Sequence, residues 1–434
     1  MQELGEAVHF LYGLRQSGVK LGLENMRRLC ALYDNPHLGY PVIHIAGTNG
    51  KGSVVAMLES VCCSAGIRCA AFTSPHLQVF NERLRVNGIP ITDAELVDEV
   101  SELRGRLQKL RQQGHECTFF EATNAMAFSY FSKAGVELAL VEAGLGGRLD
   151  STNVVDPMIS VITSIGLDHQ SMLGDTLEKI AAEKAGIIKP GRPVVAGEMT
   201  ASCFEVIEAK ALSGSSPLIR PQKWLNRSTD FTSMTRWIER EETRLEINLP
   251  AAAQIRNAAT AYCVIEWMQG HGWQIEASDL RWGFQNIRWP ARFQRIHRNP
   301  DIILDGAHNA AAVADLHQTW REFYANGPET IALGCLKEKL TPEFAGNLVR
   351  LVSNAHTVIH LPVEDKRSAS CQDIQKALGS HIQINIRSAG IHAVLDQFVN
   401  SPSDRRFLIF GSLYLAGQVL SHIDHEDFQP ELNG

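Results

Sequence analysis

The sequence predicts an α/β protein: a mostly parallel, P-loop-type sheet flanked by helices, with a small antiparallel annex, plus a second, smaller α/β domain. Short apolar runs alternate with helical patterns over most of the chain before residue 290, as in a sheet built from βαβ units. A Gly-rich turn, HIAGTNGKGS at 44–53, joins one of these runs to a helix start. After the sequence WPARF at 289–293 the alternation restarts, which indicates the second domain.

The composition limits the class of protein. The chain has 434 residues, 44% of them hydrophobic and 21% charged, so each of two domains can bury a core. A net charge of −7 argues against a strongly basic surface, and we expect no nucleic-acid partner. Nine cysteines without a C-x-x-C pair indicate reduced thiols and a cytoplasmic protein. No apolar run approaches the roughly 20 residues that span a membrane, so no membrane partner is expected.

The first domain is expected to occupy residues 1–290. A helix should follow the Gly-rich turn at 51–66, where apolar residues recur at helical spacing. A second, charged amphipathic helix is expected at 95–113, after Thr92 or Asp93 as its N-cap. The expected strands are 42–46, 69–72, 136–141, 159–165 and 193–196.

The pattern changes at 213–250, where short polar segments and strict alternation predict the antiparallel annex. Helices are expected next, at 254–269 and 278–286. A linker at 291–298 then leads to the second domain at 299–434. Its expected strands are 301–305, 330–335, 356–361, 382–387 and 406–411.

The Gly-rich turn has the composition of a phosphate cradle. Glycines let backbone N–H groups turn inward, and the helix N-terminus adds partial positive charge. Lys51 would reach the terminal phosphates and Ser53 could hold Mg²⁺ through its hydroxyl. Gly52 separates the two, so this is not a strict Walker A motif, and a turn without a ligand is the alternative. The expected nucleotide residues are Gly47, Thr48, Asn49, Gly50, Lys51, Gly52 and Ser53.

Three further polar groups follow strands of the first sheet, where open α/β sheets place their ligands: Glu142, His169 and Lys184. Each has a structural alternative: a capping carboxylate, a hydrogen-bonded histidine and a solvated lysine. Their common placement beside the phosphate loop (residues 47–53) favours a functional role for all three. Because Mg²⁺ prefers oxygen ligands, Ser53 and Glu142 fit it well, and His169 can complete a site.

At this point five motifs resemble the folylpolyglutamate synthase/dihydrofolate synthase family of the Mur ligase superfamily. They are GTNGKGS, TSPHLQVFNERLRVNG, VEAGLGGRLDSTN, GLDHQSMLGDTLEKIAAEKAGIIKPG and LDGAHNAAA, and GSLYLAG at 411–417 also fits. The resemblance implies ATP-dependent addition of L-glutamate to dihydropteroate, to reduced folates, or to both. In that family ATP converts the acceptor carboxylate to an acyl phosphate, which the glutamate amine then attacks.

The resemblance also implies roles for individual residues. Lys51, Lys184 and His169 would be catalytic, and Ser53, Glu142 and His169 would bind magnesium. Lys184 matches a lysine that the family carbamylates, a monovalent cation is a further candidate ion, and a monomer is expected. Beyond the phosphate loop, the ATP contacts would be Asn257, Arg292, Asp305 and His308. The pterin side would use Leu21, Gly22, Ser74, His76, Thr118, Phe119, Phe120, Glu121, Leu149, Asp150 and Ser151.

Two departures from the family pattern stand out: Ala291 replaces a glycine in the linker, and Ala310 replaces the proline after DGAHN. The first puts the backbone shape of the linker in doubt, and the second should have little effect. Three alternatives remain: a Mur-type ligase for another carboxylate, an inactive nucleotide-binding relative, and a GTPase-like switch. The switch would need a base-reading N-K-x-D motif, which the chain lacks.

Overall fold

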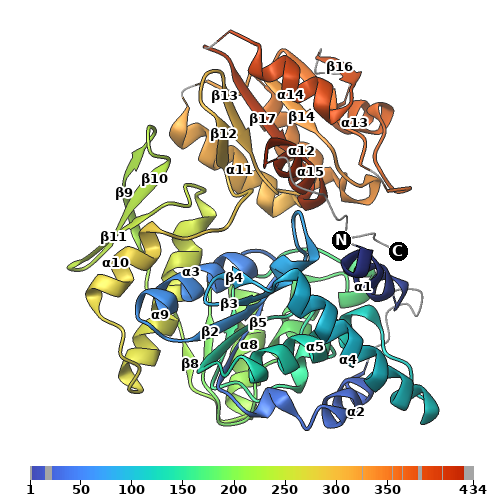
Figure 1. Cartoon of the computed structure of the whole chain (residues 1–434). Helices are drawn as coiled ribbons and strands as arrows, with labels where there is room; N and C mark the ends of the chain where they lie inside the picture. The colour runs from blue at the N-terminus through green and yellow to red at the C-terminus, as the bar shows by residue number, and fades with distance from the viewer. Residues whose placement is uncertain are drawn as a thin grey trace.

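Figure 1 shows two lobes stacked on one another, with a small separate sheet at one side. Each lobe contains a sheet covered by helices, which confirms the predicted α/β class. No described helix is long and apolar enough to cross a membrane. This computed structural model describes residues 2–14, 22–324, 326–353, 355–363, 365–379, 384–402 and 404–424.

The larger lobe is built on an eight-stranded sheet. Its strands are β1 (Val42–Ala46), β2 (Cys69–Phe72), β3 (Leu84–Val86), β4 (Ile89–Pro90), β5 (Leu138–Glu142), β6 (Ile159–Ile162), β7 (Val194–Ala196) and β8 (Leu218–Ile219). Their order across the sheet is β4-β3-β2-β5-β1-β6-β7-β8, with β3 and β4 antiparallel at one edge. Strand β1 is parallel to both neighbours and wholly buried, which explains why its residues other than His44 are apolar.

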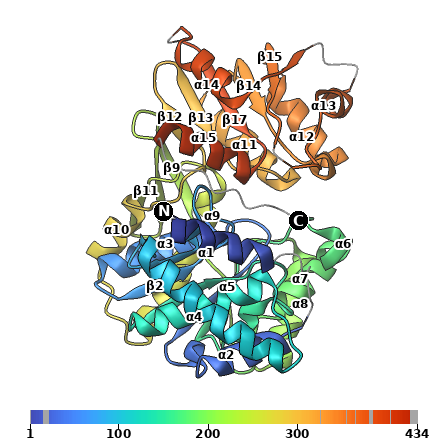
Figure 2. The ribbon, with the colours of Figure 1, turned by 45° about the vertical axis from the view of Figure 1, so that its right-hand side comes forward.

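Helices cover both faces of this sheet (Figure 2). They are α1 (Gln2–Gly13), α2 (Glu24–Leu32), α3 (Lys51–Ser64), α4 (Asp93–Gln112), α5 (Phe119–Lys133), α6 (Gln170–Leu173), α7 (Leu177–Ala185), α8 (Ala201–Ser213), α9 (Ala253–Gly270) and α10 (Ala277–Gln285). Helices α3, α9 and α10 share one apolar core with β1, and α1, α2, α4 and α5 build a second core. The phosphate loop therefore lies at the end of a central strand, at a reversal of strand order.

The small sheet confirms the predicted antiparallel annex. It has the order β11-β10-β9, with antiparallel pairing throughout. In Figure 1 it stands beside the larger lobe and reaches toward the smaller one. Its strands are β9 (Leu225–Asp230), β10 (Thr235–Arg240) and β11 (Thr243–Ile247).

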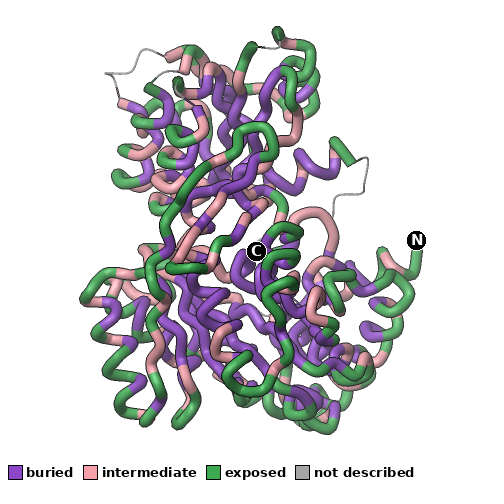
Figure 3. The backbone as a smooth tube through the Cα atoms, turned by 90° about the vertical axis from the view of Figure 1, so that its left-hand side faces the viewer, coloured by how far each residue is buried: buried purple, intermediate pink, exposed green. Residues whose placement is uncertain are grey.

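The smaller lobe contains a six-stranded sheet of order β12-β13-β17-β14-β15-β16, in which β12 is the antiparallel edge. The strands are β12 (Gln294–His297), β13 (Asp301–Leu304), β14 (Thr330–Leu333), β15 (Thr357–His360), β16 (Asn385–Ser388) and β17 (Arg406–Phe410). The helices are α11 (Ala310–Phe323), α12 (Pro342–Val352), α13 (Cys371–Leu378), α14 (Ile391–Val399) and α15 (Leu413–Asp424). Figure 3 shows a buried interior in each lobe. The strand expected at 382–387 begins at Asn385, and residues 382 and 383 lie outside the described residues.

The linker keeps an unusual backbone although it lacks the expected glycine. Ala291 and Phe293 have φ angles of +56° and +54°, in the left-handed region that favours glycine. The carboxylate of Asp305 accepts the backbone N–H of Phe293 at 2.7 Å, and the N–H of Gly306 donates to the Ala291 carbonyl at 2.9 Å. The second lobe thus holds the linker shape that Ala291 alone would not favour.

Candidate active site

The phosphate loop is fixed by the segment that follows β6. The N–H of Thr48 donates to the carbonyl of Ser164 at 2.8 Å, and its hydroxyl exchanges hydrogen bonds with the backbone of Gly166. The N–H of Asn49 donates to the Ser164 hydroxyl at 3.1 Å. These bonds hold the loop against the segment that follows β6.

Two glycines of the loop are required by close approaches. A Cβ on Gly50 would lie 2.3 Å from Oδ1 of Asn257, and one on Gly52 would lie 2.2 Å from the indole of Trp289. The extra glycine that distinguishes this loop from a Walker A motif therefore makes room for the ring of Trp289, which lies just before the linker. Asn257, expected at the nucleotide, lies directly against the loop.

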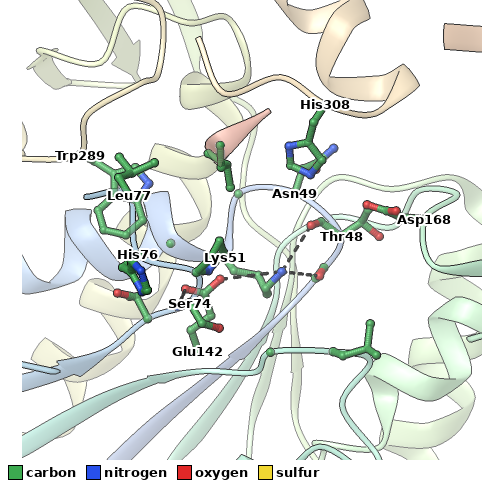
Figure 4. A pocket seen from close by; sticks show the side chains of 18 of the residues that line it. Thr48, Asn49, Lys51, Ser74, His76, Leu77, Glu142, Asp168, Trp289 and His308 are labelled. Atoms are coloured by element: carbon green, nitrogen blue, oxygen red, sulfur yellow. Dashed lines mark hydrogen bonds and ion pairs between the residues drawn. The ribbon is translucent and has the colours of Figure 1, made fainter. Parts of the chain in front are cut away.

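Lys51 lies at the centre of the cavity, between the loop and β5 (Figure 4). Its ammonium donates to the carbonyls of Gly47 and Thr48 at 3.2 and 3.4 Å, and lies 3.8 Å from the carboxylate of Glu142. These partners are two neutral carbonyls and one distant carboxylate. The positive charge of Lys51 is therefore available to an anionic ligand.

Glu142, at the end of β5, is a buried carboxylate. Its Oε2 accepts the N–H of Ser74 at 3.2 Å. Burial raises the pKa of Glu142, and the nearby Lys51 opposes that rise. The Ser74 N–H, Arg292 and Arg85 also oppose the rise, and the buried carboxylate faces the cavity, where it could ligate a cation.

Lys184, on α7, is 4% exposed. Its ammonium donates to the Gly47 carbonyl at 2.9 Å. Burial, reinforced by the positive charge of Lys51, lowers the pKa of Lys184 to about 7. A large fraction of this side chain is therefore a neutral amine near neutral pH.

His169 begins the short helix α6 with a left-handed φ of +48°. Its side chain is half-exposed at the cavity edge, 3.9 Å from the Asp168 carboxylate. Burial lowers the pKa of His169, and Asp168 opposes that shift. The imidazole is therefore mostly neutral near pH 7 and can act as a metal ligand.

The donor set suits magnesium. Glu142 and His169 line the same cavity, and Ser53 lies buried on the first turn of α3. In the described part of the chain no group of three His, Cys, Asp or Glu side chains could hold a metal ion by itself. An ion here would need further oxygen ligands from phosphate and water, which is how Mg²⁺ is usually bound. It would then neutralise charge on the phosphates.

The cavity, of about 210 Å³, is lined by both lobes. The predicted residues that line it are Gly47, Thr48, Asn49, Gly50, Lys51, Gly52, Ser74, His76, Glu142, His169, Lys184, Arg292 and His308. Burial lowers the pKa of His308 to about 4 and raises that of Asp305 to about 6, the latter against the charge of Arg292. Asp305 lies behind the lining and is bonded to the backbone of Phe293 and Ala307.

Of the described residues expected on the pterin side, Ser74 and His76 line the cavity and the others do not. Thr118 and Glu121 bond to one another and cap α5. The Phe120 ring packs against Gly144, which lines the cavity. Asp150 accepts hydrogen bonds from Leu145 and Thr152. The remaining ones are Gly22, Phe119, Leu149 and Ser151, whereas Leu21 lies outside the described residues.

Sequence reasoning missed some residues that the structure brings to the site. Trp289 and Arg85 line the cavity, and the guanidinium carbon of Arg85 lies over the Trp289 ring, 5.5 Å from the ring centroid. Asp168 also lines it and binds Lys339 of the second lobe. Asp168 directly precedes His169, and Trp289 precedes the linker, so proximity to the motifs was the available signal. Lys339 carried no such signal.

This architecture is that of a two-domain, ATP-dependent ligase of the Mur type. Residues 45–265 match the Mur ligase middle domain, and residues 291–413 match the Mur ligase, glutamate ligase domain. The chain belongs to the folylpolyglutamate synthase/dihydrofolate synthase family, which confirms the resemblance.

Three relatives illustrate the similarity. The dihydrofolate synthase/folylpolyglutamate synthase of Bacillus subtilis is 35% identical over 427 residues, covering 95% of this chain and 97% of that protein. The folylpolyglutamate synthase of Lacticaseibacillus casei is 34% identical over 400 residues, covering 89% and 90%. The structure of the E. coli enzyme FolC in complex with DHPP and ADP superposes with a TM-score of 0.82 at 29% identity, covering 97% of this chain and 98% of that one.

Proposed function

We propose that this ligase adds L-glutamate to dihydropteroate, to reduced folates, or to both. The observation that carries the proposal is the convergence of Lys51, Glu142 and Lys184 on one cavity that both lobes line. Relatives that span nearly the whole chain have names that include both activities. A Mur-type ligase for a different carboxylate is not favoured, because the named relatives are folate enzymes.

The chemistry needs a site that tolerates negative charge. An oxygen of the acceptor carboxylate attacks the γ-phosphorus of ATP, forming an acyl phosphate and releasing ADP. The amine of glutamate then attacks the acyl carbon, and phosphate leaves from the tetrahedral intermediate. Lys51 and the backbone N–H groups of the phosphate loop would hold the phosphates. Asn257, Arg292, Asp305 and His308 would contact the rest of ATP.

We further propose that Lys184 is carbamylated. Its amine is buried, has a pKa lowered to about 7 and has no described carboxylate partner within hydrogen-bonding distance, so its neutral fraction near pH 7 can attack CO₂. Reaction forms an N–C bond and releases a proton, and the product is an anion. That anion would lie close to Lys51 and could support the magnesium held by Glu142, His169 and Ser53. A monovalent cation is the further ion we propose for the site.

We also propose a monomeric, cytoplasmic enzyme with domains at residues 1–290 and 299–434. Strand β12 lies within the expected linker at 291–298 but pairs with β13 of the second sheet, so that part of the linker belongs to the smaller lobe. The pterin would lie on the side of Ser74 and His76, with the wall behind it shaped by the residues at 118–121 and 149–151. Pocket shape rather than a unique polar contact would then decide between the two acceptors.

The test is glutamate-dependent phosphate release from Mg·ATP, measured separately with dihydropteroate and with tetrahydrofolate. Turnover with both identifies a bifunctional enzyme, and turnover with one identifies a dedicated synthase or polyglutamylase. A protein that binds ATP but is silent with both acceptors would overturn the proposal.

A further inference from the structure

A polar cluster joins the two lobes beside the phosphate loop. The side-chain amides of Asn49 and Asn309 exchange hydrogen bonds of 3.2 and 2.9 Å across the interface. Asn309 also donates to Asp168 at 3.4 Å, and the ammonium of Lys339 forms an ion pair with the same carboxylate at 2.5 Å. Asn49 and Asp168 belong to the larger lobe, and Asn309 and Lys339 to the smaller one.

Asp168 connects this cluster to the candidate metal ligand. The carboxylate oxygen that binds Lys339 also accepts the backbone N–H of His169 at 2.9 Å. His169 has a left-handed backbone, a conformation that is unfavourable for a non-glycine residue and so must be held by its surroundings. The Asp168 carboxylate, which accepts the N–H of His169, thus helps to hold the backbone of His169 in this conformation.

The two residues of the smaller lobe are themselves held by that lobe. Asn309 caps α11 by accepting the N–H of Ala312 at 3.0 Å. Lys339 ends a short 3₁₀ helix, Lys337–Lys339, whose first N–H donates to the Arg367 carbonyl at 2.8 Å. Their contacts with Asp168 therefore form only when the lobes are docked.

We propose that Lys339 is a positioning residue that acts through Asp168 and makes the presentation of His169 depend on docking of the second lobe. The side chain of Lys339 is 18% exposed and that of Asp168 11%, so the pair is shielded enough for its charges to matter. One oxygen of the Asp168 carboxylate accepts from both the Lys339 ammonium and the backbone N–H of His169. This inference uses the proposed magnesium and ATP site, but not the identity of the folate acceptor.

The test compares Lys339→Met with Lys337→Met. Lys337 lies on the same turn, but it is 69% exposed and pairs with Asp373 inside the smaller lobe. The readout is binding of the non-hydrolysable analogue AMPPCP, titrated with Mg²⁺ in the absence of turnover. We expect Lys339→Met to raise the Mg²⁺ concentration for half-maximal binding about tenfold, the scale of one lost charge-assisted hydrogen bond. Lys337→Met should match the wild type.

Two further variants separate positioning from a simple tether. Lys339→Arg keeps the charge and should recover most of the Mg²⁺ affinity. Asp168→Asn should weaken Mg²⁺ binding, and combining it with Lys339→Met should add little, because both act on one contact. A Lys339→Met protein that melts earlier yet needs no more Mg²⁺ would overturn the proposal, as would additive effects. A wild type that does not bind AMPPCP would instead contradict the nucleotide site itself.

Discussion

Polar side chains that line the cavity and polar side chains behind its lining differ in how they are satisfied. In the lining, Lys51 and Lys184 donate mainly to carbonyls of the phosphate loop, and Glu142 accepts one backbone N–H. Behind the lining, Thr118 and Glu121 are bonded to one another as a capping box. The difference teaches that charge is kept available where phosphate would bind, whereas the polar groups behind the lining cap a helix.

The strongest test of this comparison is Lys184→Met. We expect glutamate-dependent phosphate release to fall by about 10²–10³-fold, as when a charge-stabilising group is removed. Stability should not fall. The pKa of Lys184 in the folded protein, about 7, lies below its ordinary value of 10.5, so burial of the ammonium destabilises the fold. That destabilisation is full below about pH 7 and fades as the pH rises toward 10.5.

The control is Lys179→Ala on the same helix, because Lys179 is exposed and pairs with Asp175. It should leave the rate unchanged. Wild-type turnover by Lys184→Met would show that Lys184 has no role in the reaction. If the Lys184→Met protein is inactive because it is unfolded, the same measurement is made on Lys184→Gln.

The next prediction concerns pH. CO₂ reacts with a neutral amine, so at constant dissolved CO₂ the carbamylation rate of Lys184 should rise about tenfold per pH unit below pH 7 and level off above it. Carbon-13 NMR with labelled CO₂ would follow the carbamate directly. An ordinary lysine would show no plateau before about pH 10. A rate that still climbs steeply at pH 9 would therefore contradict the buried, neutral amine.

For Thr118, behind the cavity lining, we expect stability effects instead. Thr118→Ala should lower the free energy of unfolding by about 1 kcal/mol through loss of an N-cap, with less than a threefold rise in the KM of the acceptor. Thr92→Ala is the matched control, since Thr92 forms the same capping box on α4. Denaturant unfolding and steady-state kinetics measure both. A tenfold KM increase for Thr118→Ala alone would show direct contact with the acceptor.

The sequence predicted which residues of the phosphate loop and of the strand ends gather around the cavity, because they lie in contiguous motifs or at strand ends. Lys51 and Glu142 follow apolar runs that could be recognised as buried strands. The Asp168–Lys339 pair could not be predicted, because its partners are 171 residues apart and in different lobes. Nor could the sequence show that Thr118 would be bonded to Glu121, since a capping threonine and a ligand-binding threonine have the same local pattern.

The smallest effect is expected in the linker, where Ala291→Gly should stabilise the protein by up to about 1 kcal/mol. A left-handed φ costs alanine roughly 1–2 kcal/mol, and the added freedom of glycine in the unfolded chain offsets about half of that gain. Ala209→Gly on the exposed face of α8 should instead lose about 1 kcal/mol, because it introduces glycine into a helix. Equal losses in the two variants, measured by denaturant unfolding, would mean that the linker at Ala291 is not strained. The hydrogen bonds of Asp305 and Gly306 would then hold a backbone that is not strained. Docking of the lobes would in that case depend on side-chain contacts such as Asp168–Lys339.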